Sequence, residues 1–182
     1  MIAIGIIVII LILYILSTYN KIVKLLNIVK QSESGIDIYL KQRFELIPNL
    51  VECVKGYTNY EKTTLEDITK MRTEYMNNSS LKKAEKLNKE INSILAIAEK
   101  YPELKASEQY LKLQESLIKI ESQLQAARRI YNNDVTKYNT TIGVVPKNFV
   151  AKLFGFKKAD VFQIEEYKRN NVNIENEIKD EK

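Results

Sequence analysis

Five charged residues lie on or beside apolar stripes of this chain, and they are the residues best placed to do chemistry. They are Glu33, Arg43, Glu61, Glu121 and Arg128. A pair of carboxylates could perform acid–base catalysis if burial raised the pKa of one of them. Arginines in the same pattern would instead keep neighbouring carboxylates ionised. We therefore interpret the five as a structural polar network that pairs helices and fixes their register.

The chain contains no histidine and a single cysteine, Cys53. Without histidine it lacks the commonest general base and the commonest metal ligand, which excludes a ferritin-like di-iron site built on Glu-x-x-His. One cysteine excludes an internal disulfide and a cysteine-based metal cluster, and we interpret Cys53 as a small buried helical residue. We therefore predict no catalytic residue, no metal, no cofactor and no enzymatic activity.

Helices are the elements that must position these side chains. From Ile22 onward, apolar residues recur at spacings of three and four, which is typical of one buried helix face. A soft break at Ser32–Gly35 and a boundary at Pro48 interrupt the first helical region. Asn77–Ser80 ends it, with Ser80 placed to cap the helix that follows.

Two further helical regions follow at the same spacing. One begins at Leu81 and ends near Tyr101–Pro102, and the longest runs from Glu103 to about Gly143. No window alternates apolar and polar residues, so no strand is expected. Short connections between these helices favour an all-α fold with an antiparallel four-helix bundle, in part of coiled-coil character.

The N-terminal segment has a different composition from the rest of the chain. Residues 1–20 carry no charged side chain, and Ile2–Leu16 is almost purely aliphatic. Crossing a hydrocarbon core takes about 20 apolar residues. A cleaved secretory signal would need a basic n-region, and a lipoprotein a cysteine after the run; neither is present. We predict one uncleaved transmembrane helix.

Lysines follow this predicted span but none precedes it. The lysines are Lys21, Lys24 and Lys30, and positive charges after a span favour the cytoplasmic side. We therefore predict a single-pass protein in the cell membrane, with its N-terminus outside and its body in the cytoplasm. The body is predicted as one helical domain over residues 21–162, and residues 163–182 as a flexible charged tail. The net charge of +5 is mild and both signs are interspersed, which argues against a nucleic-acid partner.

Residues 143–158 combine aromatic and basic side chains. The candidate membrane-surface residues are Lys147, Phe149, Lys152, Phe154, Phe156, Lys157 and Lys158. The phenylalanines could enter a lipid surface while the lysines face anionic headgroups. The segment could equally cap one end of the bundle, which Pro146 and Gly155 slightly favour because both shape loops. Asn49, Asn132 and Asn139 are expected to make hydrogen bonds at helix ends or between helices rather than to form a ligand patch.

Three separate stretches of the chain resemble the LemA family. Arg43–Val51, with the sequence RFELIPNLV, resembles one marked block, and Tyr101–Ser107 and Ala127–Asn132 resemble two others. Relatives often have His-Glu where this chain has Tyr60–Glu61, so any role of that histidine in the family cannot be assigned to this chain. The resemblance implies a short outside N-terminus, one membrane span and a four-helix bundle. It implies no biochemical activity.

The function predicted from these features is that of a membrane-anchored scaffold or adaptor. It would associate with itself as a homo-oligomer or bind other membrane-associated proteins. Anchoring in a plane raises the effective concentration of the protein, so that weak lateral contacts are sufficient for association. A protein that binds or remodels the lipid surface is the first alternative. An enzyme that uses buried carboxylates is the second.

Overall fold

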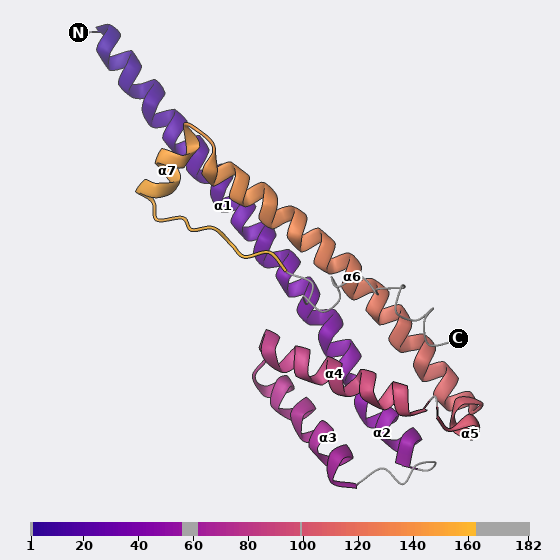
Figure 1. Cartoon of the computed structure of the whole chain (residues 1–182). Helices are drawn as coiled ribbons and strands as arrows, with labels where there is room; N and C mark the ends of the chain where they lie inside the picture. The colour runs from indigo at the N-terminus through magenta and orange to yellow at the C-terminus, as the bar shows by residue number, and fades with distance from the viewer. Residues whose placement is uncertain (1, 56–61, 99, 163–182) are drawn as a thin grey trace, which may run out of the picture. The chain divides into compact units, whose positions relative to one another are not determined.

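The computed structural model describes residues 2–55, 62–98 and 100–162. These residues form helices and irregular connections without a strand, which confirms the predicted all-helical class (Figure 1). The described helices are α1 (Ile2–Glu45), α2 (Ile47–Lys55), α3 (Lys62–Asn77), α4 (Leu81–Ala98), α5 (Pro102–Lys105), α6 (Glu108–Gly143) and α7 (Lys147–Leu153). The predictions for Glu61 and for residues 163–182 lie outside the described residues.

α1 continues through the stretch where a soft break was expected, so that prediction is wrong. The Ser32 and Ser34 hydroxyls donate to carbonyl oxygens one turn back, on Ile28 and Lys30, at 3.1 and 3.0 Å. These polar side chains are thus satisfied without leaving the helix. The boundary predicted at Pro48 is confirmed, because α1 ends at Glu45 and Pro48 stands in the first turn of α2, where its missing N–H is tolerated.

Serine side chains mark the start of two helices. The backbone N–H of Lys83 donates to Ser80 Oγ at 3.3 Å, which confirms Ser80 as the cap of α4. The helix expected from Glu103 divides instead into the short α5 and the long α6. Ser107 separates them and accepts a hydrogen bond from the N–H of Tyr110 at 3.4 Å, so it caps α6.

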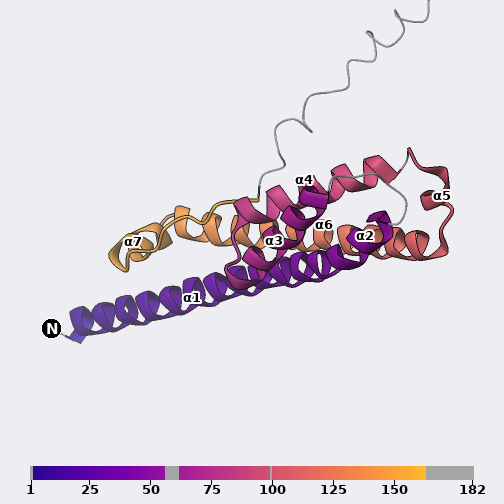
Figure 2. The ribbon, with the colours of Figure 1, turned by 90° about the horizontal axis from the view of Figure 1, so that it is seen from below.

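The chain divides into two compact units. The body unit comprises residues 24–130, and the anchor unit comprises residues 1–23 together with 131–182. In the body unit α3 and α4 pack side by side, and α2 contacts both (Figure 2). Its core includes Phe44 and Tyr75, whose rings meet edge to face with centroids 4.7 Å apart.

Burial raises the pKa of Tyr75 to about 12, with a smaller contribution from Asp37. An unfolded tyrosine ionises near pH 10, so this side chain stabilises the fold fully below about pH 10 and loses that contribution between about pH 10 and 12. This loss amounts to about 2–3 kcal/mol of the free energy of unfolding, and Tyr75→Phe should remove it because phenylalanine does not ionise. Chemical unfolding of both proteins between pH 9 and 12 tests it, and identical pH profiles for both would contradict it.

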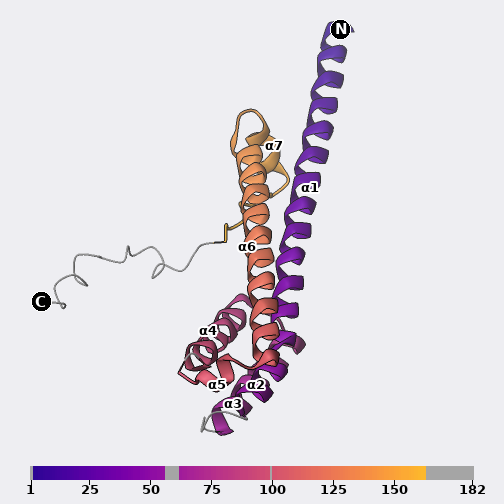
Figure 3. The same cartoon turned by 90° about the vertical axis from the view of Figure 1, so that its right-hand side faces the viewer.

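The anchor unit contains the apolar start of α1. From Ile2 to Leu16 every side chain of α1 is exposed except that of Ile15, and burial begins at Thr18 and Ile22. By length and composition, α1 is able to cross a membrane. The rest of the described anchor unit is the C-terminal part of α6, the adjacent α7 and an extended segment after it (Figure 3).

Candidate functional site

Arg43 is a buried charged residue of the body unit, with 6% of its surface exposed. It lies in the last turn of α1 and forms an ion pair with Glu121 of α6. Its Nη2 also donates to Asn92 Oδ1 of α4 at 3.3 Å. Burial, and secondarily the positive charge of Arg128, lowers the pKa of Arg43 to about 10. One guanidinium therefore links three helices, and Asn92 is a partner that the sequence pattern did not suggest.

The other members of the predicted network lie in different surroundings. Arg128 is half-buried and close enough to Arg43 to affect its pKa, whereas Glu33 is exposed. Arg72 joins the same region, because its Nε donates to the Phe44 carbonyl oxygen at 3.2 Å. That bond satisfies a carbonyl at the C-terminal end of α1, where a cation is favourable.

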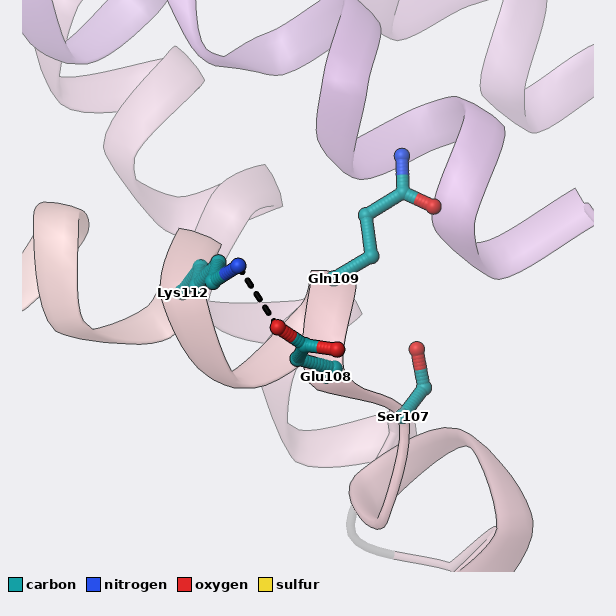
Figure 4. Close-up of a pocket in the computed structure, with 4 residues that line it drawn as sticks. All are labelled: Ser107, Glu108, Gln109 and Lys112. Atoms are coloured by element: carbon teal, nitrogen blue, oxygen red, sulfur yellow. Dashed lines mark hydrogen bonds and ion pairs between the residues drawn. The ribbon is translucent and has the colours of Figure 1, made fainter.

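The body unit also contains a surface hollow and a cysteine. A shallow hollow at the start of α6 is lined by Ser107, Glu108, Gln109 and Lys112, with Lys112 Nζ and Glu108 Oε1 2.7 Å apart (Figure 4). Its four residues come from the first turns of α6 and from the cap before them, so the hollow is open to solvent. Cys53 is buried in α2, and burial raises the pKa of its thiol, which disfavours the reactive thiolate.

A second polar arrangement lies in the anchor unit, where α6 holds an extended segment of residues 156–162, here called the strap. The Asn139 side chain pairs with both backbone groups of Ala159: Nδ2 donates to the carbonyl at 2.8 Å, and Oδ1 accepts from the N–H at 2.9 Å. Asn132 pairs with Phe162 in the same way, at 2.9 and 2.7 Å. Each asparagine thus binds the strap backbone as a neighbouring β-strand would.

Two tyrosines extend this arrangement. Tyr138 and Tyr131 donate their hydroxyls to the carbonyls of Lys157 and Asp160, at 2.8 and 3.0 Å. We call Tyr131, Asn132, Tyr138 and Asn139 the Tyr-Asn ladder. Its two dipeptides stand one heptad apart on α6, a rise of about 10.5 Å, and Ala159 and Phe162 are about 10 Å apart in an extended chain. The matching repeats explain why both asparagines find a backbone pair.

The asparagines therefore bind an extended chain, rather than the helix ends or neighbouring helices that were expected. Asn49, the third of the set, is exposed. The sequence did hold a signal: the dipeptide Tyr-Asn occurs twice at heptad spacing, at 131–132 and 138–139. The sequence of the strap gave no such signal, because the asparagines bind the backbone of the strap and not its side chains.

Gly155 directs the chain from α7 into the strap. It has a φ of +72°, a conformation that glycine adopts without strain. The N–H groups of Gly155 and Phe156 donate to the carbonyls of Lys152 and Ala151, at 3.2 and 2.9 Å. This is the Schellman pattern, which ends a helix and reverses the chain.

α7 turns one apolar face inward and another outward. Val150 and Ala151 are buried, while Phe149 and Leu153, one turn apart, are 66% and 72% exposed. Val145, in the turn that precedes α7, is also exposed. We call Val145, Phe149 and Leu153 the α7 face; its two aliphatic members were not among the predicted surface residues.

The predicted surface residues divide in the structure. Lys152, Lys157 and Lys158 are exposed and Lys147 is half-buried. The rings of Phe154 and Phe156 pack against Tyr19 of α1, with centroids 4.7 and 5.7 Å apart. Phe156 is half-buried by this packing, whereas Phe154 remains partly exposed.

Both arrangements lie in the part of the chain that matches one protein family. The profile of the LemA family matches residues 32–175. The chain belongs to the LemA family. Among curated proteins, Protein LemA of Metamycoplasma hominis is 29% identical over 158 residues, covering 84% of this chain and 72% of that protein. Magnetosome protein MamQ 2 of Paramagnetospirillum magneticum is 22% identical over 178 residues, covering 81% of this chain.

The LemA match includes Arg43, Glu121 and the complete Tyr-Asn ladder with its strap. It begins after the apolar segment of α1. This LemA-family chain spans 65% of the length of the MamQ 2 protein, just under two thirds.

Proposed function

We propose that this LemA-family protein is a membrane-anchored helical scaffold that binds itself or other proteins at the cytoplasmic face of the membrane. The observation that carries the proposal is the change along α1. Every apolar side chain from Ile2 to Leu16 except Ile15 is exposed, whereas from Ile22 onward one face of α1 is buried, at Val29, Ile36 and Leu40, and Ile28 and Ile38 stay exposed on another. An exposed apolar run of this length is unfavourable in water and suits a lipid environment.

The proposed orientation rests on Lys21, Lys24 and Lys30, which follow the span and favour a cytoplasmic body. We further propose that the body unit is a four-helix bundle, in which α1 and α2 together form one arm beside α3, α4 and α6. The packing of α2, α3 and α4 and the Arg43–Glu121 ion pair between α1 and α6 support that arrangement. Binding rather than catalysis is proposed because the chain lacks histidine and Glu121 is engaged by Arg43.

Leu111 and Ile118 of α6 are the proposed contact surface. They stand one heptad apart on the same helix face and are 49% and 64% exposed. Removing two such side chains from a protein interface should lower association by about tenfold or more.

Crosslinking of the full-length protein in intact membranes, with mass measurement of the products, tests this surface. We expect homo-oligomers or defined hetero-complexes that the Leu111→Glu/Ile118→Glu variant loses. Ser116→Glu/Gln123→Glu is the matched control, because these two exposed residues have the same spacing on the opposite side of α6. A strictly monomeric protein without crosslinked partners would refute the scaffold.

A further inference from the structure

We propose that the α7 face and its flanking lysines are a second membrane contact, which lies on the surface of an anionic bilayer beside the span. The proposal rests on the membrane anchoring proposed above and adds a lipid surface as the partner of the anchor unit. It follows from three observations within that unit: the level of α7 along α1, the exposure of its apolar side chains, and the charge of the segment.

The level of the bilayer surface is set by α1. The continuous run of exposed aliphatic residues ends at Leu16 and the first charged side chain is Lys21, so the surface crosses α1 within an interval of about 7 Å along its axis. Tyr19 lies in this interval, and the Phe154 ring packs on it with centroids 4.7 Å apart. The C-terminal end of α7 is therefore at the level of the headgroups.

The exposed side chains of α7 suit that level. Phe149 and Leu153 lie one turn apart on α7, Val145 lies in the turn before the helix, and each of the three is more than half exposed. The opposite residues Val150 and Ala151 are buried, which holds α7 against the rest of the unit. A short helix that is apolar on its free face and attached on the other is suited to the boundary between headgroups and acyl chains.

The charge around α7 favours an anionic lipid surface over a second protein surface. Between Val144 and Phe162 the chain has the four lysines 147, 152, 157 and 158 and one acidic residue, Asp160. Lys157 and Lys158 directly follow Phe156, the first residue of the strap, whose ring also packs on Tyr19. The Tyr-Asn ladder fixes the backbone of this strap, including the Lys157 carbonyl. The lysines are thereby held near the headgroup level.

The chain contains no tryptophan, so single tryptophan substitutions report local surroundings without background. The full-length protein is reconstituted into vesicles of phosphatidylcholine and phosphatidylglycerol that contain lipids brominated near the headgroup. Phe149→Trp and Leu153→Trp report on the α7 face. Leu11→Trp reports on the span. Ile38→Trp, 55% exposed on the part of α1 that belongs to the body unit, is the matched control.

We expect the brominated lipid to quench the indole of Phe149→Trp and Leu153→Trp by about half, as for an interfacial helix, and to leave that of Ile38→Trp unchanged. Changing Lys152, Lys157 and Lys158 to Gln in the Phe149→Trp protein should reduce the quenching, as should high salt. Equal quenching in vesicles without phosphatidylglycerol would overturn the role of anionic headgroups.

The controls separate failure of this contact from failure of the anchor. If Leu11→Trp is quenched but Phe149→Trp and Leu153→Trp are not, the α7 contact is refuted and the anchor stands. If Leu11→Trp is not quenched, the anchoring itself is refuted, and this contact with it. If the α7 positions are shielded from aqueous acrylamide but not quenched by brominated lipid, a protein surface covers them, which also overturns the proposal. Two separate α7 positions guard against a local effect of either substitution.

Discussion

Glu121→Gln is expected to lower the free energy of unfolding by about 3 kcal/mol, because it leaves Arg43 buried without its counter-charge. Arg43 is 6% exposed and close enough to Arg128 to be affected by its charge, so loss of the carboxylate leaves a buried cation beside a like charge. Glutamine keeps the size of the side chain, so the effect reports on charge and not on packing. Chemical unfolding of the full-length protein in detergent, followed by helical circular dichroism, measures it.

The ion pair should also be asymmetric. Arg43→Met leaves the Glu121 side chain, which is 31% exposed, free to be hydrated, so we expect a smaller loss of about 1–2 kcal/mol. Replacing both residues by Met and Leu should recover part of the loss from Glu121→Gln. Glu115→Gln, at an exposed position of the same helix, is the control and should change little. If Glu121→Gln behaves like Glu115→Gln, the pair contributes nothing to stability.

Asn132→Ala together with Asn139→Ala is expected to release the strap from α6. Each asparagine makes two hydrogen bonds with the strap backbone, together worth about 2 kcal/mol. Each single change should therefore speed amide hydrogen exchange of Ala159 or Phe162 by about 30-fold, and the double change should speed both. Exchange measured by mass spectrometry on peptides that cover residues 157–162 tests this.

Conservative variants distinguish recognition of the backbone from simple packing. Asn139→Asp keeps the acceptor for the Ala159 N–H but places a carboxylate against the Ala159 carbonyl, so it should release the strap nearly as fully as alanine does. Asn133→Ala, at the exposed neighbouring position, is the control. Trypsin offers a second readout, since Lys157 and Lys158 should be cut faster once the strap is free. Unchanged exchange in the double variant would mean that other contacts hold the strap.

Local sequence chemistry was sufficient to predict most of the helices. The spacing of apolar residues predicted α4 and most of α6, Ser80 identified a cap, and Pro48 marked the boundary between α1 and α2. Such features act within one or two turns, so nearby residues suffice to predict them. The expected break at Ser32–Gly35 was wrong because serine hydroxyls can also bond within a helix, and sequence alone does not distinguish the two outcomes.

The partners of the polar side chains were beyond local reasoning. The sequence predicted that Arg43 needs a carboxylate but offered several, and only packing selected Glu121 and added Asn92. The chain also showed two Tyr-Asn dipeptides one heptad apart, without indicating what they bind. Their partners are backbone groups of an extended segment, which carry no side-chain signature, and the contact depends on matching the rise of a helix to that of a strand.

By itself the sequence determined an uncharged apolar segment able to cross a membrane, an all-helical chain, and the lack of histidine chemistry. These follow from composition and periodicity, which need no knowledge of contacts between distant residues. The tertiary structure decided that α7 and the strap lie beside Tyr19, at the end of the apolar segment. That placement depends on residues more than a hundred positions apart meeting in space, which no local pattern encodes.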